Sequence, residues 1–236
     1  YMIDDFEGAI KDTNKAIEID PEDAYAYGLR ADSKGAINDY KGAIFDATVA
    51  IGIDPEDAYA YFIRGKAKFM NDDYEGAIKD ANKAIEIDPE YADAYGLRAD
   101  SKGVTNDYEG AIKDANKAIE IDPEYVYAYV IRGQAKYMID DYEGAIIDST
   151  MAIGIDPEDV YAYVLRADSK LMNDDYEGAI IDSTMAIGID PEYSSAYLTR
   201  GNAKEAYDNL SGACSDWRKA AQLGDEDAKE YVKDQC

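Results

Sequence analysis

The chain has 236 residues, of which 47% are hydrophobic and 11% aromatic, so it can fold around a sizeable core. Its 51 acidic and 24 basic residues give a net charge of −27, which repels phosphate backbones and argues against nucleic-acid binding. Histidine is absent, which removes the commonest general base and the commonest transition-metal ligand. No apolar run approaches the roughly 18 residues of a membrane span.

The prolines reveal a repeated unit. All six, from Pro21 to Pro191, are 34 residues apart, and six of the seven arginines, from Arg30 to Arg200, keep the same interval. A fixed period of about 20 to 50 residues is typical of array proteins. The sequence therefore predicts one array without internal domain boundaries or linkers.

Each unit is predicted to form two helices. The first comes after Asp54, which we expect to cap it, and Pro55, which suits a first helical turn. Polar residues at 71–73 then break the pattern and can cap the second helix. That second helix is expected from 74 to about 87, because apolar residues recur there at helical spacing on one face. Proline ends the unit, since it cannot continue a helix interior.

The unit length and several residue types resemble the tetratricopeptide repeat family. The resemblance rests on an early aromatic, small residues at the helix crossing, an aromatic opening the second helix and a closing proline: Tyr61, Gly65, Tyr74, Ala77, Ala84 and Pro89. It implies an all-α, right-handed superhelical solenoid of antiparallel helix pairs. Arg64 and its equivalents depart from the pattern, because the family usually has leucine there. The segment from Ala213 to Cys236 also resembles the closing unit of bacterial members.

The expected organisation is a single array over residues 1–236. It begins with the second helix of a truncated repeat at 1–23 and continues through full repeats at 24–57, 58–91, 92–125, 126–159, 160–193 and 194–227. Residues 228–236 are expected to form a capping helix that shields the last hydrophobic face.

Arginine and aspartate recur in step, 16 residues apart. The pairs are Arg30 with Asp46, Arg64 with Asp80, Arg98 with Asp114, Arg132 with Asp148, Arg166 with Asp182, and Arg200 with Asp216. Antiparallel helices bring both members of a pair to a similar level, which predicts a ladder of bidentate bridges. The alternative is an anion-binding track, and we favour the structural role because each arginine has an acid within reach. Such pairs fix register more than they add stability.

The family resemblance also implies a concave, partner-binding groove along the first helices. The residues mapped to it are Tyr59, Phe62, Lys66, Phe69 and Met70, then Tyr127, Val130, Gln134, Tyr137 and Met138, then Tyr161, Val164, Asp168, Leu171 and Met172. Aromatic and Met side chains suit adaptable, apolar recognition, although any one of them could instead pack between neighbouring first helices. Glycines leave the wall low in alternating units, at Gly28, Gly35, Gly96 and Gly103. A site for a peptide's terminal carboxylate is disfavoured, because Lys66 and Asn202 are isolated among aspartates.

Two cysteines lie close to the C-terminal end. Cys214 is about nine residues before a predicted turn at 223–225 and Cys236 about eleven after it, or ~14 and ~17 Å along antiparallel helices. A disulfide is feasible and would imply an extracytoplasmic or extracellular location. Two reduced thiols in a cytoplasmic protein remain the equal alternative.

No catalytic, metal or cofactor site is expected. The acidic corners at 72–73, 140–141 and 174–175 lack the spacing of a calcium loop and are interpreted as helix caps. There is no nucleophile with a base and no phosphate cradle, so the sequence predicts a non-enzyme.

Two functions fit these features. The leading one is a scaffold for protein or peptide partners, and the acidic surface favours cationic or aromatic ones. The alternative is a self-assembling protein that forms head-to-tail filaments. Residues 228–236 take the first nine places of a unit and Tyr1 takes the twelfth, so one copy could continue the solenoid of the next.

Overall fold

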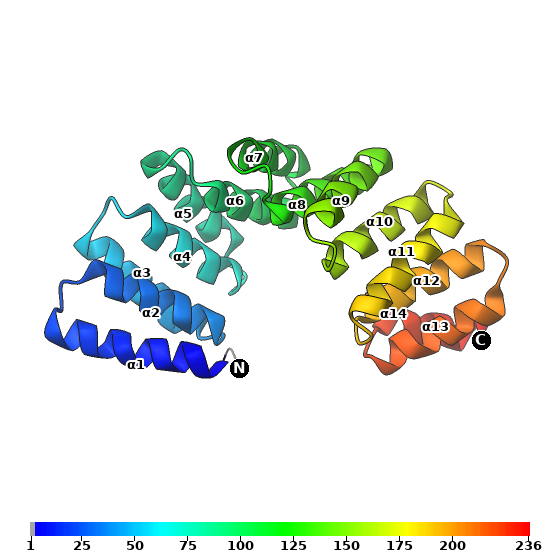
Figure 1. The fold of residues 1–236 in the computed structure, drawn as a ribbon, viewed down its shortest axis with the longest axis horizontal. Helices are drawn as coiled ribbons and strands as arrows, with labels where there is room; N and C mark the ends of the chain where they lie inside the picture. The colour runs from blue at the N-terminus through cyan, green and yellow to red at the C-terminus, as the bar shows by residue number, and fades with distance from the viewer. Residues whose placement is uncertain (1–2) are drawn as a thin grey trace. The chain divides into compact units, whose positions relative to one another are not determined.

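The computed structural model describes residues 3–236, and all the helices and turns in this range belong to an all-α fold (Figure 1). The first helices of the repeats are α2 (Ala24–Ala36), α4 (Ala58–Phe69), α6 (Ala92–Val104), α8 (Val126–Met138), α10 (Val160–Met172) and α12 (Ser194–Ala206). The second helices are α1 (Ile3–Ile19), α3 (Tyr40–Ile53), α5 (Tyr74–Ile87), α7 (Tyr108–Ile121), α9 (Tyr142–Ile155), α11 (Tyr176–Ile189) and α13 (Leu210–Gln222), and α14 (Glu226–Gln235) comes after them.

The chain divides into two compact units, which are described separately. Unit 1 comprises residues 1–123 with α1 to α7, and unit 2 comprises residues 124–236 with α8 to α14. Within each unit, every helix packs against the next one along the chain, and the first helices of neighbouring repeats also touch. The first helices therefore form one layer of each unit and the second helices form the other.

The cap of the first helix differs from the prediction. Asp54 ends α3, and its side chain accepts a hydrogen bond from the Glu56 amide within the turn that contains Pro55. Asp57 caps α4 instead, and its carboxylate accepts from the Ala60 amide at 3.2 Å. The prediction of Asp54 as the cap was wrong because two aspartates flank the proline, and the chain must turn between them.

The polar residues at the corner between the two helices of a repeat form the turn and cap the second helix. Asp72 has a φ of +62°, a left-handed conformation that Asn and Asp tolerate better than most residues. Its carboxylate accepts a hydrogen bond from the Tyr74 hydroxyl at 2.9 Å, while Asp73 caps α5. The acidic corners are thus structural, and no group of metal-binding residues is found among residues 3–236.

Alanine provides most of the core. In α3, Ala43, Ala47 and Ala50 are fully buried, and alanines at the places of Ala43 and Ala50 are buried in every later second helix. Such small side chains let neighbouring helices approach closely. Gly65 also permits a close approach of helices, because a Cβ there would lie 2.9 Å from the side chain of Leu97.

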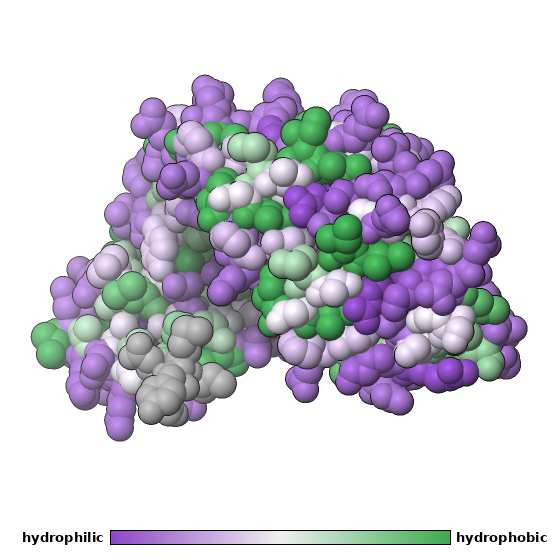
Figure 2. Space-filling view, turned by 45° about the vertical axis from the view of Figure 1, so that its right-hand side comes forward, coloured by the Kyte–Doolittle hydropathy of each residue, from purple (hydrophilic) through white to green (hydrophobic). Residues whose placement is uncertain are grey.

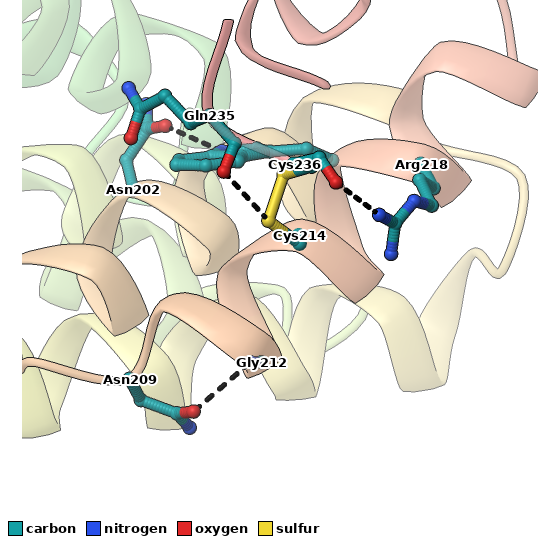
Figure 3. Close-up of a disulfide and its surroundings, with 8 residues drawn as sticks. Asn202, Asn209, Gly212, Cys214, Arg218, Gln235 and Cys236 are labelled. Carbon is teal, nitrogen blue, oxygen red and sulfur yellow. Dashed lines mark hydrogen bonds between the residues drawn. A yellow bond between two sulfur atoms is a disulfide. The ribbon is translucent and has the colours of Figure 1, made fainter. Parts of the chain in front are cut away.

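A different core closes the C-terminal end of unit 2. Trp217 is fully buried, packs on Tyr231 of α14 and donates a hydrogen bond to Asn202 at 2.9 Å. A disulfide joins Cys214 of α13 to Cys236, with their Cα atoms 5.7 Å apart (Figure 3). These contacts fasten α14 to α13. In residues 3–236, no helix has the length and apolar character needed to cross a membrane.

Candidate protein-binding groove

Each repeat holds an arginine between its two helices. The guanidinium donates through Nε and Nη2 to both oxygens of the aspartate 16 residues later, at 2.5–3.0 Å. The geometry is that of bidentate bridges in all six predicted pairs, from Arg30–Asp46 to Arg200–Asp216. The aspartates are buried, so these bridges lie within the scaffold, between the two helices of each repeat.

Each bridge has two further partners that were not predicted from the sequence. A lysine four residues after each arginine, such as Lys170, also pairs with the aspartate at 2.7–2.8 Å. A tyrosine three residues before each arginine, such as Tyr163, lies under the guanidinium, with the Cζ atom 5.2–5.5 Å from the ring centroid. Helical spacing of three and four residues around the arginine could have revealed both partners.

In unit 1, a small apolar pocket lies between α2, α4 and the start of α3. Its volume is about 130 Å³, and Lys66 and Met70 of the predicted groove line it. Gly35, one of the glycines expected to lower the wall, also lines it. Asp32 and Lys66 lie at this pocket, with the lysine Nζ 3.7 Å from the carboxylate.

The other groove residues predicted in unit 1 are mostly half-buried. Tyr59 and Phe62 pack against the cluster around Ile63, and burial raises the pKa of Tyr59 well above its usual value. Phe62 also contacts the ring of Tyr91, and Phe69 contacts that of Tyr74. These aromatic side chains are shared between packing and surface.

In unit 2, the first helices form a larger pocket. It has a volume of about 230 Å³ and lies between α8 and α10, closed by Tyr193 just before α12. It gathers seven of the predicted groove residues: Val130, Gln134, Tyr137, Met138, Tyr161, Val164 and Asp168. Tyr161 is 65% exposed and Met138 50%, whereas Val164 is buried. Tyr127 and Met172 are exposed on the same helices without lining this pocket.

Leu165 and Tyr193 also line this pocket, although they were not among the groove residues predicted from the sequence. Tyr193 precedes α12 at the position where Asp57 caps α4, and it makes no side-chain cap bond. The same replacement occurs at Tyr91 and Tyr125. Loss of an Asp cap costs a helix about 1 kcal/mol. A tyrosine at a capping position therefore indicates a role other than capping, and the sequence alone could have suggested it.

Asp168 is the charged residue of the pocket in unit 2. Its Oδ1 accepts a hydrogen bond from the Thr199 hydroxyl at 2.7 Å. Burial raises the pKa of this carboxyl to about 6, and the Thr199 bond opposes that rise. On its own helix, Val164 lies four residues before Asp168 and Leu171 three after, so both share its face of α10.

The opposite layer carries a second surface feature. On α9 and α11, the exposed positions include Ile147, Met151, Ile181 and Met185. The equivalent places of α5 and α7 hold lysines, so the outer faces of the second helices are not alike. Hydrophobic patches interrupt an otherwise hydrophilic surface in the view of Figure 2.

These features define a class of protein, an array of helical hairpins with a pocket between first helices in each of its two units. Two family profiles described as tetratricopeptide repeat match the sequence, one at residues 58–91 and one at 92–125. The chain is therefore a tetratricopeptide repeat protein. A search of curated protein sequences gives no match.

Solved structures share this fold. A tetratricopeptide repeat protein from Parabacteroides merdae superposes with a TM-score of 0.74 at 21% identity, over 97% of this chain and 91% of that one. PilW, described as a widely conserved type IV pilus biogenesis factor, gives 0.80 at 16% identity, over 89% and 98%. YrrB, described as having an unusual peptide-binding site, gives 0.61 at 20% identity, over 79% and 97%. At these identities the likeness concerns the fold alone.

Proposed function

We propose that this chain is a non-enzymatic scaffold that binds protein or peptide segments along its first helices, with a preference for cationic or aromatic ones. The observation that carries the proposal is the pocket between α8 and α10, where exposed tyrosine and methionine side chains surround a carboxylate. Methionine adapts to varied partners, and tyrosine is enriched where binding energy concentrates. The net charge of −27 attracts basic segments from a distance.

A selection from a random peptide library on the full chain tests the proposal. Enriched sequences should carry a net positive charge and aromatic residues, and their affinity should fall as salt rises. Tyr161→Ala should weaken the selected peptides by about tenfold or more, the usual range for an aromatic anchor.

Ile181→Ala is the matched control, because Ile181 is 62% exposed on the outer face of α11, close to the 65% of Tyr161. It should leave affinity unchanged. Enrichment of acidic peptides, or equal losses in the two variants, would refute binding in the groove.

Self-assembly from head to tail is our second candidate, and the contacts of α14 make it the weaker one. The outward residues of α14 are charged and exposed, including Glu226, Lys229 and Glu230. Burying them against another copy would cost desolvation without an apolar gain. Tyr1 and Met2, the other half of the supposed joint, lie outside the described residues. Light scattering at rising concentration would show growing mass if filaments form and a constant mass otherwise.

The bonded cysteines bear on the compartment. We propose that the protein works where disulfides persist, outside the reducing cytoplasm, because Cys214 and Cys236 are joined in unit 2. Alkylation of the native protein without reductant, followed by mass spectrometry, should leave both cysteines unlabelled. Labelling of both would place the protein in a reducing compartment.

A further inference from the structure

Three tyrosines surround the carboxylate of the pocket in unit 2. Tyr137 comes from α8, Tyr161 from α10 and Tyr193 from the residue that precedes α12, and all three line the pocket with Asp168. The rings of Tyr161 and Tyr193 meet edge to face, with centroids 5.3 Å apart. The pocket thus combines π faces with one negative charge in about 230 Å³.

Asp168 has no cation of its own among the described residues. Asp32, one of the two aspartates at the same repeat position in unit 1, is 44% exposed, and the Nζ atom of Lys66 from the following repeat lies 3.7 Å from its carboxylate. The place that corresponds to Lys66 after Asp168 is Asn202, a neutral side chain that accepts a hydrogen bond from Trp217. The group that donates to Asp168 is the neutral hydroxyl of Thr199. A half-buried carboxylate without a counter-charge is costly, and an external cation would relieve that cost.

The chain itself shows what such a site accepts. Six times, an arginine guanidinium lies over a tyrosine ring and donates to an aspartate, as Arg166 does between Tyr163 and Asp182. The pocket at Asp168 supplies tyrosine rings and a carboxylate, but it contains no arginine. A guanidinium suits a half-buried site better than an ammonium, because it is planar, stacks on rings and is more weakly hydrated.

We propose that this pocket is a binding site for one arginine side chain of a partner protein, with the guanidinium against the tyrosine rings and bonded to Asp168. The inference rests on the proposed function and assigns the chemistry of one anchor within the groove. Gln134 on α8 also lines the pocket and offers a neutral amide to the same guest.

Protonation gives the site a pH dependence. Because the pKa of Asp168 is raised to about 6, its carboxylate is about nine-tenths protonated at pH 5 and almost fully ionised at pH 7.5. The titratable side chains that line the pocket with it are Tyr137, Tyr161 and Tyr193. Burial raises the pKa of Tyr137 and of Tyr193, so these two stay neutral in this range, and Thr199 does not titrate. Arginine affinity should therefore fall by about tenfold from pH 7.5 to pH 5.

An NMR titration of the full chain with three small probes tests the site. The probes are the N-acetyl amides of arginine, of lysine and of citrulline, the neutral analogue of arginine, at constant ionic strength. Arginine should bind about tenfold more tightly than citrulline, since a charge-assisted bond is lost in the analogue, and should also exceed lysine. The perturbed amides should include those of Asp168 and Thr199.

The variants separate this pocket from general attraction to an acidic surface. Asp168→Asn should remove the difference between arginine and citrulline and the pH dependence, whereas Glu143→Gln, which removes an exposed charge of α9, should change neither. Equal binding of arginine and citrulline by the unaltered chain, or lysine binding as tightly as arginine, would overturn the assignment without relying on any variant.

Library-selected peptides distinguish failure of this inference from failure of the proposed function. If they bind and lose affinity with Tyr161→Ala but not with Asp168→Asn, the groove stands and the arginine site is wrong. If no peptide binds the groove at all, both are wrong. If arginine-containing peptides lose affinity in both variants, the result supports both the proposed function and the arginine site.

Discussion

The buried ion pairs predict that loss of one aspartate from the ladder should be severe. In the repeat formed by α10 and α11, Asp182 accepts from Arg166 at 2.7 and 2.9 Å and from Lys170 at 2.7 Å. The side chains of Arg166 and Lys170 are only 17% and 21% exposed, and that of Asp182 is 3% exposed. Asp182→Ala therefore leaves two largely buried cations without their counter-charge.

The expected loss can be sized from this geometry. Removing one partner of a buried ion pair typically costs about 3–5 kcal/mol, mostly from the charge left behind. Because two cations are stranded here, we expect the upper part of this range. The triple variant Arg166→Met, Lys170→Met, Asp182→Leu should recover most of the loss, since apolar residues of similar volume often replace a buried ion pair at little cost.

Urea unfolding followed by far-ultraviolet circular dichroism measures these differences. Glu143→Ala, which removes an exposed carboxylate from α9, is the control and should change the free energy of unfolding by less than about 0.5 kcal/mol. The reasoning is refuted if Asp182→Ala is as mild as the control. It is refuted equally if the triple variant is as unstable as the single one.

Further predictions concern a glycine, the disulfide and the pocket carboxylate. Gly154→Ala should raise stability by about 0.5–1 kcal/mol in thermal melts, because a Cβ there meets nothing within 4 Å, whereas Gly201→Ala should lower it, because its Cβ would lie 2.5 Å from Trp217. The bond between Cys214 and Cys236 closes a separation of 22 residues, so its reduction should destabilise the C-terminal end by roughly 3 kcal/mol. Amide hydrogen exchange in α14 should then become faster, and unchanged exchange would contradict this prediction. For Asp168 the folded pKa is raised from 3.8 to about 6, so the folded state loses roughly 3 kcal/mol of stability as pH rises through this window. Asp168→Asn should therefore be more stable than the unaltered chain at pH 7.5 and equal to it near pH 4, and equal stability at both values would argue against the burial of the charge.

The repeats could be predicted from the sequence because their signals are local. The helix limits are set by proline, capping aspartate and helical spacing, all within a few residues of one another, and α5 begins and ends where these signals place it. The first-helix cap was wrong because Asp54 and Asp57 offer the same chemistry three residues apart. Only the path of the turn decides between them.

The pocket could be predicted only in part, because its properties depend on neighbouring repeats. Asp32 and Asp168 are the same residue type at the same repeat position. Asp32, which is 44% exposed, has Gly28 and Gly35 at the flanking places of its helix, where Asp168 has Val164 and Leu171. The side chain that faces each aspartate comes from the next first helix, about 34 residues away, so the difference in charge and burial appears only when the helices are packed.

The central claim is that partners bind the first-helix layer, and amide NMR mapping with a library-selected peptide tests it most directly. Perturbed resonances should cluster on α8, α10 and the start of α12, around Tyr161 and Asp168. Perturbations centred instead on Ile147 and Ile181, on the outer face of α9 and α11, would contradict the claim.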